Sequence, residues 1–221
     1  MSLLASIPFL KSRSVIPRQV FSSSWVDRMQ ILDEDVNLFC WKRPVKTAII
    51  SYLETLSSKS LSPITFTSHI DDLPEKLSQA RKLWDQDHSS RADVFWIDAY
   101  RLIHDFMVLV ETESATIHLK KVVDNQCAKF HTDGYSLRLF TTYSGAGTQW
   151  LPERATNRNA FGKTNELIVN DVSQIQQMRQ FEVGILKGGL PNERQPSKGI
   201  VHKSPEINHK GEKRIILRVD I

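Results

Sequence analysis

The chain has little of several things that would assign it to a class directly. Its 221 residues include only two cysteines, Cys40 and Cys127, which is too few for a disulfide framework and favours a reducing compartment. No apolar run approaches the roughly 20 residues that a membrane helix needs. Internal repeats and low-complexity tracts are also lacking. We therefore expect a cytoplasmic protein that does not span a membrane.

The basic excess is small and is spread along the chain. Lysine and arginine number 29 against 25 acidic residues, a formal net charge of +4, and they form no basic block. Because nucleic-acid binding usually needs clustered positive charge, the composition argues against nucleic acid as a partner. With 40% hydrophobic and 24% charged residues, the chain has an ordinary globular composition and is long enough for a substantial core.

The first 30 residues are expected to form an arm. Residues 1–26 contain Lys11, Arg13, Arg18, several serines and no acid, a composition that is also found in organellar transit peptides. A mobile arm lying on the domain is the simpler interpretation.

The remainder divides by its hydrophobic spacing. In residues 31–113, apolar residues recur every three or four positions over 45–56, 71–84 and 90–109, which predicts a mainly helical region, with a possible short strand at 64–67. From about residue 114 short alternating runs bounded by glycines predict strands. The candidate strands are 115–123, 126–131, 135–143, 148–151, 166–170, 181–187, 199–203 and 212–220.

Eight short strands after a helical region predict an α+β chain. Its C-terminal half, residues 114–221, is expected to be a double-stranded β-helix (jelly roll) buttressed by the helices of residues 31–113. No stretch rich in proline, glycine or serine separates the two regions near residue 113. We therefore expect them to form one compact domain.

His131 and Asp133 form a possible metal-binding pair. Alternate residues of a strand point to the same face, so an imidazole and a carboxylate two positions apart can bind one ion. His202, at the end of a later apolar strand, would complete a set of two nitrogens and one carboxylate. That is the ligand set of non-haem iron(II) oxygenases, although zinc, manganese and nickel also accept it.

The His-x-Asp pattern is a weak signal by itself. Seven histidines and 25 acidic residues in 221 positions give about one chance match, and His69-Ile-Asp71 is such a match at a predicted helix start. His209 lies in a predicted exposed turn, while His104 and His118 have no acid at ligand spacing on the same face. A structural role is also the commoner one for a histidine in the setting of His202.

The last predicted strand carries its charges on one face. Arg214, Arg218 and Asp220 alternate with apolar residues at 215, 217 and 219, so the apolar face is expected in the core. The arginines either lie on a solvated outer face or, in the case of Arg214, point into the mouth of a barrel. There the planar guanidinium could bind a carboxylate.

Four segments in this order resemble the iron(II)/2-oxoglutarate-dependent oxygenases, and most closely their taurine-dioxygenase branch. The segments are His131-Thr-Asp133, Gly145-Ala-Gly-Thr148-Gln-Trp150, His202, and Lys213-Arg214 with Arg218. The resemblance covers roughly residues 115–221. It implies an oxygenase that uses iron(II) and 2-oxoglutarate to hydroxylate a substrate, which could be a small molecule or a protein side chain.

The resemblance also implies roles for individual residues. The metal ligands would be His131, Asp133 and His202. Arg214 and Thr148 would bind the far carboxylate of 2-oxoglutarate, and Arg218 would meet an anionic substrate. The segment between the metal-binding pair and Thr148 is shorter than in that branch, which leaves Arg138 and Tyr143 as alternative contacts for 2-oxoglutarate.

The whole chain also resembles a bacterial family known only as a domain of unknown function, DUF1826. The shared blocks are Phe-His-x-Asp, Thr-Tyr-x-Gly-x-Gly-Thr and Gly-Ile-x-His-x-Ser-Pro, and they imply no activity. Two alternatives to the oxygenase therefore stay open. One is a non-catalytic jelly roll that binds zinc, to which Cys127 could add a thiolate; the other is a scaffold whose chemistry has been lost.

Overall fold

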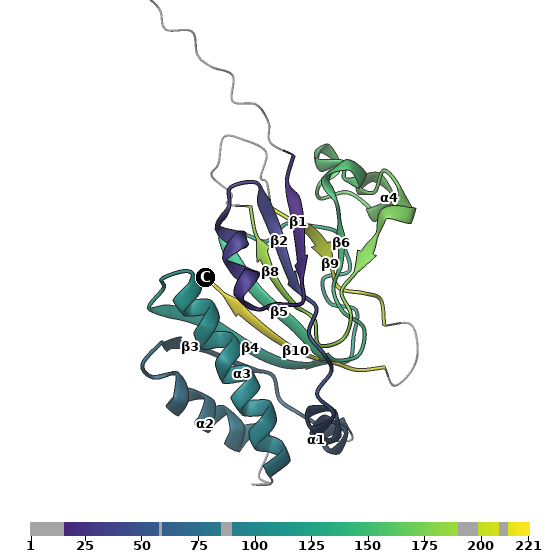
Figure 1. Ribbon diagram of the computed structural model, residues 1–221. Helices are drawn as coiled ribbons and strands as arrows, with labels where there is room; N and C mark the ends of the chain where they lie inside the picture. Colours follow the sequence, from purple (N-terminus) through teal and green to yellow (C-terminus); the bar gives the residue numbers. More distant parts are fainter. Residues whose placement is uncertain (1–15, 58, 85–89, 190–198, 208–211) are drawn as a thin grey trace, which may run out of the picture.

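The structure, a computed structural model, contains two sheets in the residues that it describes, which are 16–57, 59–84, 90–189, 199–207 and 212–221 (Figure 1). The main sheet contains, from edge to edge, β1 (Arg18–Ser22), β2 (Val36–Trp41), β8 (Val183–Lys187), β5 (Leu137–Ser144), β10 (Arg214–Asp220), β4 (Ser114–Val122) and β3 (Ile64–His69). The small sheet contains β7 (Gln176–Gln177), β6 (Gln149–Leu151) and β9 (Val201–Lys203). Within these described strands, β1 and β2 pair in parallel and the other neighbours are antiparallel.

Three long helices accompany the sheets: α1 (Thr47–Ser57), α2 (Leu73–Trp84) and α3 (Ser90–Leu109). The shorter helices are η1 (Val26–Leu32), η2 (Glu153–Ala155), η3 (Arg158–Ala160), α4 (Asn165–Ile168) and η4 (Val172–Gln174). In the part of the chain that is described, no helix combines the length and the apolar character needed to cross a bilayer. In Figure 1 the long helices lie on one side of the main sheet, and the small sheet lies with α4 on the other.

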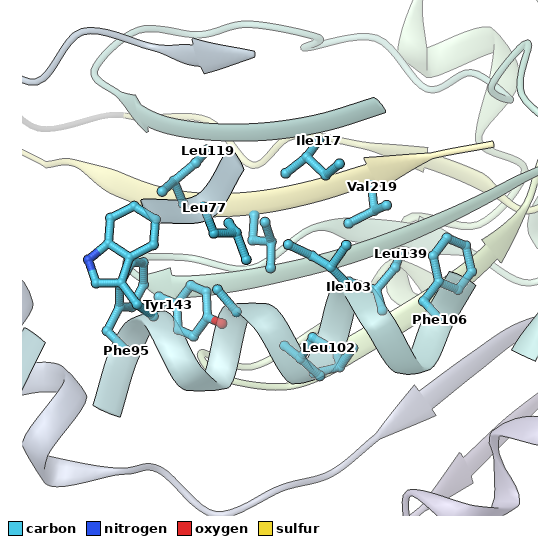
Figure 2. Close-up of a cluster of buried hydrophobic side chains, with 14 of the residues drawn as sticks. Leu77, Phe95, Leu102, Ile103, Phe106, Ile117, Leu119, Leu139, Tyr143 and Val219 are labelled. Carbon is cyan, nitrogen blue, oxygen red and sulfur yellow. The ribbon is translucent and has the colours of Figure 1, made fainter. Parts of the chain in front are cut away.

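The largest core lies between the helices and one face of the main sheet. Figure 2 shows Ile103 and Phe106 of α3 near Leu139 and Val219 of the strands, and Phe95 at the other end of the helix also packed against the sheet. These five side chains are fully buried. The strand residues alternate with polar ones, so the apolar face predicted for the last strand is in the core. This face of the sheet is therefore committed to packing.

A buried ion cluster ties α3 to this face. Asp98 of α3 accepts from Arg43 Nη1 at 2.8 Å, from Lys46 Nζ at 2.7 Å and from the Tyr143 hydroxyl at 2.9 Å. Arg43 and Asp98 are almost completely buried, with side chains 2% and 5% exposed. Burial raises the pKa of Asp98, but the charge of Arg43 and the hydrogen bond from Lys46 lower it by more than burial raises it. The net shift of the pKa is therefore downward.

The opposite face of the main sheet looks toward the small sheet. A second apolar cluster fills much of the gap between them and includes Leu38, Phe140 and Ile216 of the main sheet with Trp150 of β6. The charged residues of β10 lie on this same face, because they alternate with the core residues. Beside the apolar cluster the space between the sheets is polar, and the predicted metal-binding residues meet there.

The mainly helical N-terminal half is not confirmed. β2 and β3 lie within residues 31–113 and are strands of the main sheet, and residues 18–22 of the predicted arm form β1 at its edge. The run in β2 is buried on both faces, so its sequence lacks the alternation that reveals a half-buried strand. Residues 31–113 therefore contribute strands to the main sheet as well as the helices α1, α2 and α3 that lie beside it. Residues 1–15 lie outside the described part of the chain.

Six of the eight strands predicted after residue 113 are present, each within two residues of its expected bounds. The prediction for residues 126–131 is wrong, because the chain turns there: Gln126 N bonds Asp124 O, and Cys127 has φ +52°. The prediction for residues 166–170 is also wrong, since Asn165–Ile168 form α4. In both segments turns replace most of the pairing that alternation predicts, and one residue of each forms an isolated bridge, His131 with His202 and Val169 with Thr156. The large, mostly antiparallel sheet with a second sheet facing it is consistent with a jelly roll in a mixed α and β chain.

Candidate metal and anion site

Two backbone hydrogen bonds bring His131 and His202 together. His131 N donates to His202 O at 3.0 Å, and His202 N donates to His131 O at 2.9 Å. This is the hydrogen-bonded pair of an antiparallel ladder, so the two side chains leave the same side of the backbone. The ring centroids are 4.7 Å apart. The bridge thus joins residues that are 71 positions apart in the sequence.

Asp133 completes a group of three candidate ligands. Its Oδ1 is 3.6 Å from His131 Nε2, and its Oδ2 is 3.4 Å from His202 Nε2. The ligand atoms of the three residues all lie within 4.8 Å of one another. Asp133 and His202 are buried, and Asp133 Oδ2 has no hydrogen-bond partner. A buried carboxylate oxygen without a partner is costly, so the group is poised to bind a cation.

The backbone sets which ring nitrogens can bind a metal. His131 Nδ1 contacts Lys129 O at 2.8 Å, and His202 Nδ1 contacts Ile200 O at 3.2 Å. A carbonyl oxygen can only accept, so each Nδ1 carries the hydrogen in the neutral ring and each Nε2 keeps a lone pair. Both lone pairs face Asp133. Three electron-pair donors that point at one another repel unless a cation lies between them. A hydrogen bond from Nδ1 to a backbone carbonyl is also typical of metal-binding histidines.

The protonation states suit a metal ligand set. Burial raises the pKa of Asp133, but the neighbouring His131, His202 and Arg138 reverse this and lower it to about 2. Burial lowers the pKa of His202 to about 4. Asp133 is therefore ionised and His202 neutral at neutral pH, which are the forms that coordinate metals. The pKa of His131 is raised, mainly by the neighbouring Asp133 carboxylate, so a metal ion at this site would displace a proton from His131 more often than from His202.

A short helix outside the group holds the loop that leads to His131. Asn165 of α4 accepts from Phe130 N at 2.8 Å through Oδ1, and its Nδ2 donates to Ala128 O at 2.9 Å. These two hydrogen bonds from one side chain hold the segment in place of the strand pairing that alternation predicts. Asn165 was not identifiable from the sequence, because nothing local marks an asparagine 35 residues after Phe130 as a partner of this loop.

A cavity beside the three ligands is lined by basic residues. Arg138, Arg214 and Arg218 line it together with His131, His202, Thr148 and several apolar side chains. The two predicted histidine ligands therefore border one space with the predicted co-substrate and substrate residues Thr148, Arg214 and Arg218, and Asp133 lies beside the two histidines. The basic lining of the cavity therefore favours an anion bound next to a metal cation.

Arg214 is the most distinctive of these cations. It is 2% exposed, and its Nε donates to Ala146 O at 2.6 Å while Nη2 lies 3.4 Å from Thr142 Oγ1. Among the described residues no carboxylate pairs with it. Burial lowers its pKa to about 10, which still leaves it charged at pH 7. A buried cation without a counter-ion is a receptor for an anion.

The other arginines of the cavity are partly neutralised. Arg138 Nη1 lies 2.5 Å from Asp133 Oδ1, and Arg138 Nε donates to Asp220 Oδ1 at 2.5 Å. Arg218 Nε is 3.0 Å from Asp220 Oδ2, and its side chain keeps 23% exposure. Arg138 thus borders the cavity but is held by two carboxylates, which makes it a poorer contact for 2-oxoglutarate than Arg214.

The remaining candidates lie elsewhere. Tyr143 is on the helix face of the sheet, where its hydroxyl bonds Asp98, so it cannot contact 2-oxoglutarate in this cavity. Cys127 lines the cavity but is not part of the three-residue ligand group. Among the described residues, no thiolate therefore joins the ligands in the way that would favour zinc. His69 and Asp71 are surface residues, with side chains 43% and 86% exposed. His209 falls outside the described residues.

Comparison with known proteins adds a family and a fold. The sequence profile of a family described as "Protein of unknown function (DUF1826)" matches residues 22–220, a span that includes all three sequence blocks through which the chain resembles it, so that prediction is confirmed. No curated protein matches the sequence.

Several solved structures are similar. The rice dioxygenase for auxin oxidation has a TM-score of 0.50 at 9% identity, over 93% of this chain and 82% of that one. Its Arabidopsis thaliana counterpart, in a binary complex with 2-oxoglutarate, has 0.48 at 8% identity over 93% and 91%. A C-terminally truncated protein from Neurospora crassa, in its apo form, has 0.45 at 12% identity over 96% of both. Of these three, the rice structure supports a shared dioxygenase fold, and identities this low say nothing about activity.

Proposed function

We propose that this chain, which belongs to the DUF1826 family of unknown function, is an iron(II)- and 2-oxoglutarate-dependent oxygenase. His131, Asp133 and His202 hold the metal, and Arg214 binds the far carboxylate of 2-oxoglutarate. One observation carries the proposal: the converging ligand atoms of His131, Asp133 and His202 lie beside a cavity that a buried guanidinium without a counter-ion, that of Arg214, also borders. A metal site alone would fit many proteins, but the unpaired arginine beside it calls for an anionic co-ligand.

The chemistry follows from the ligand set. Two imidazoles and one carboxylate occupy one side of a metal and leave positions open for other ligands. When bound, iron with 2-oxoglutarate and dioxygen supplies an oxidation in which the co-substrate becomes succinate and carbon dioxide and one oxygen atom enters a substrate C–H bond. The protein orients the co-substrate through Arg214, keeps the site dry with the apolar cluster between the sheets, and holds the ligands in register.

Two further residues belong to the proposal with narrower support. Thr148 is buried and lines the cavity with Arg214, where its hydroxyl can bond the same carboxylate. Arg218 lines the cavity too, and we assign it to an anionic substrate. Since Arg218 Nε already lies near Asp220, only the outer part of its guanidinium is free for that role.

A turnover assay tests the proposal. Protein purified without oxygen, loaded with Fe²⁺ and mixed with 2-oxoglutarate and dioxygen should form succinate slowly even without its true substrate. Asp133→Ala should form none, because it loses the only carboxylate of the ligand group. Asp71→Ala is the matched control, since it removes the acid of the other His-x-Asp pair. Equal succinate from wild type and Asp133→Ala, or none from either, contradicts the proposal.

A further inference from the structure

A row of buried charges leads from Asp133 across the main sheet. Arg138 of β5 lies directly opposite Asp220 of β10 in the strand register. Its Nε donates to Asp220 Oδ1 at 2.5 Å, and its Nη1 lies 2.5 Å from Asp133 Oδ1. The side chains of Arg138 and Asp220 are 9% and 0% exposed. One planar guanidinium therefore joins a metal-site carboxylate to a carboxylate outside the metal site.

Asp220 is itself held from its other oxygen. His118 Nε2 lies 3.2 Å and Arg218 Nε 3.0 Å from Asp220 Oδ2. Neither contact has hydrogen-bond geometry, so these groups surround Asp220 Oδ2 without a hydrogen bond to it. His118 is fixed in turn, because its Nδ1 is 2.9 Å from Thr65 Oγ1 on the edge strand β3. Residues from three neighbouring strands thus fix the position of one carboxylate.

The row leaves the two oxygens of Asp133 in different situations. Oδ1 is engaged by Arg138, whereas Oδ2 is buried, has no hydrogen-bond partner and lies 3.4 Å from His202 Nε2. We propose that Arg138 and Asp220 are positioning residues: Asp220 holds Arg138, and Arg138 occupies Oδ1 of Asp133 and so presents Oδ2 to the metal. This inference rests on the proposed metal site and adds how its carboxylate is held for coordination through one oxygen.

Stability alone is a weak explanation for the row. A buried ion pair often contributes no more than apolar side chains of the same size would, and the neighbouring cluster between the sheets is apolar. Partners that fix a ligand from outside the coordination sphere, in contrast, typically change metal affinity by about 10- to 100-fold. Lysine could not replace Arg138, because a single ammonium lacks the rigid fork that spans two carboxylates.

Cobalt binding measures this role without requiring activity. We would titrate wild type, Asp220→Asn and Arg138→Lys with Co²⁺, without 2-oxoglutarate, following heat and visible absorption at a temperature where circular dichroism shows every variant folded. Both variants should bind Co²⁺ about 10- to 100-fold more weakly and with an altered absorption spectrum. Arg138→Lys keeps the charge and serves as the second variant if Asp220→Asn does not fold.

Asp98→Asn is the matched control. It also removes a buried carboxylate held by an arginine, but on the helix face of the same sheet. It should lower the melting temperature and leave Co²⁺ affinity and spectrum unchanged. If wild type binds Co²⁺ and both site variants bind it equally well with the same spectrum, the positioning role is overturned while the metal site stands. If wild type does not bind Co²⁺, the metal site fails and this inference fails with it.

Discussion

At the scale of single residues, the direction of lone pairs separates the candidate site from a chance motif. The chain contains two His-x-Asp pairs, and in both the imidazole and carboxylate are within 3.7 Å. Only at His131 does a second buried histidine join, with both Nδ1 atoms held by backbone carbonyls. A pattern of residue types gave the candidates, but the pattern contains no information on which nitrogen is free. That depends on backbone contacts made after folding.

Arg214 shows how far reasoning from the sequence reaches at this scale. Alternation along the last strand places Arg214, Arg218 and Asp220 on one face, and the structure has them there. Alternation does not say which arginine finds a carboxylate. Asp220 pairs with Arg138 and lies beside Arg218, which leaves Arg214 unpaired. The partner of Arg138 across the sheet follows from strand order, which local patterns do not determine.

Replacing Arg214 and Arg218 separately by glutamine tests their different roles. Arg214→Gln should weaken 2-oxoglutarate binding to the metal-loaded protein by about 10- to 100-fold, because hydrogen bonds to a charged group contribute about 1.5–3 kcal/mol. Its metal affinity should not change. Arg218→Gln removes the same charge from the same strand face and should bind 2-oxoglutarate as wild type does. Calorimetric titration decides between them, and an equal loss in both variants would mean that only the summed charge of the cavity matters.

At the scale of elements, the turn between β5 and β6 shapes the anion site. Gly145 has φ +84°, and a Cβ there would lie 2.5 Å from Lys213 O and 2.9 Å from Arg214 Cγ. The next residue, Ala146, accepts the hydrogen bond from Arg214 Nε. The turn therefore packs on the backbone of β10 and fixes the arginine side chain. In the sequence the two glycines of this turn indicated a break between strands, which is correct but omits the contact.

Two glycine substitutions separate backbone strain from this contact. Gly145→Ala and Gly162→Ala both place a side chain at φ +84°, but a Cβ at Gly162 meets nothing within 4 Å. Each should lose about 1–2 kcal/mol of unfolding free energy for the left-handed backbone. Gly145→Ala should lose more and should also weaken 2-oxoglutarate binding, because Arg214 must move. Urea unfolding and calorimetry would measure both effects, and unchanged 2-oxoglutarate affinity in Gly145→Ala would separate the turn from the site.

At the scale of the whole molecule, the two faces of the main sheet have different tasks. The face toward the helices holds the large core and the Asp98 cluster, and the other face holds the charged residues that border the site. Strands after residue 113 were most predictable where apolar and polar residues alternate, as in β4 and β10, although β5, β8, β9 and β10 are largely buried on both faces. β1 and β2 were not, since β2 is buried throughout and β1 is a short edge strand. The long-range pairing of residues 131 and 202 follows from the assembled sheets and not from local sequence.

Because the proposed metal and 2-oxoglutarate sites lie together on one face of the main sheet, the binding of 2-oxoglutarate is the most direct test of the proposed function. The measurement is the affinity of the anaerobic wild-type protein for 2-oxoglutarate with and without Fe²⁺, repeated with His202→Ala. The two histidine ligands and Arg214 border one cavity, so 2-oxoglutarate should bind tightly only when the metal is present, and His202→Ala should abolish that dependence. If 2-oxoglutarate binds no better with Fe²⁺ than without it, or binds equally to His202→Ala, the site is not the metal and 2-oxoglutarate centre proposed for this chain.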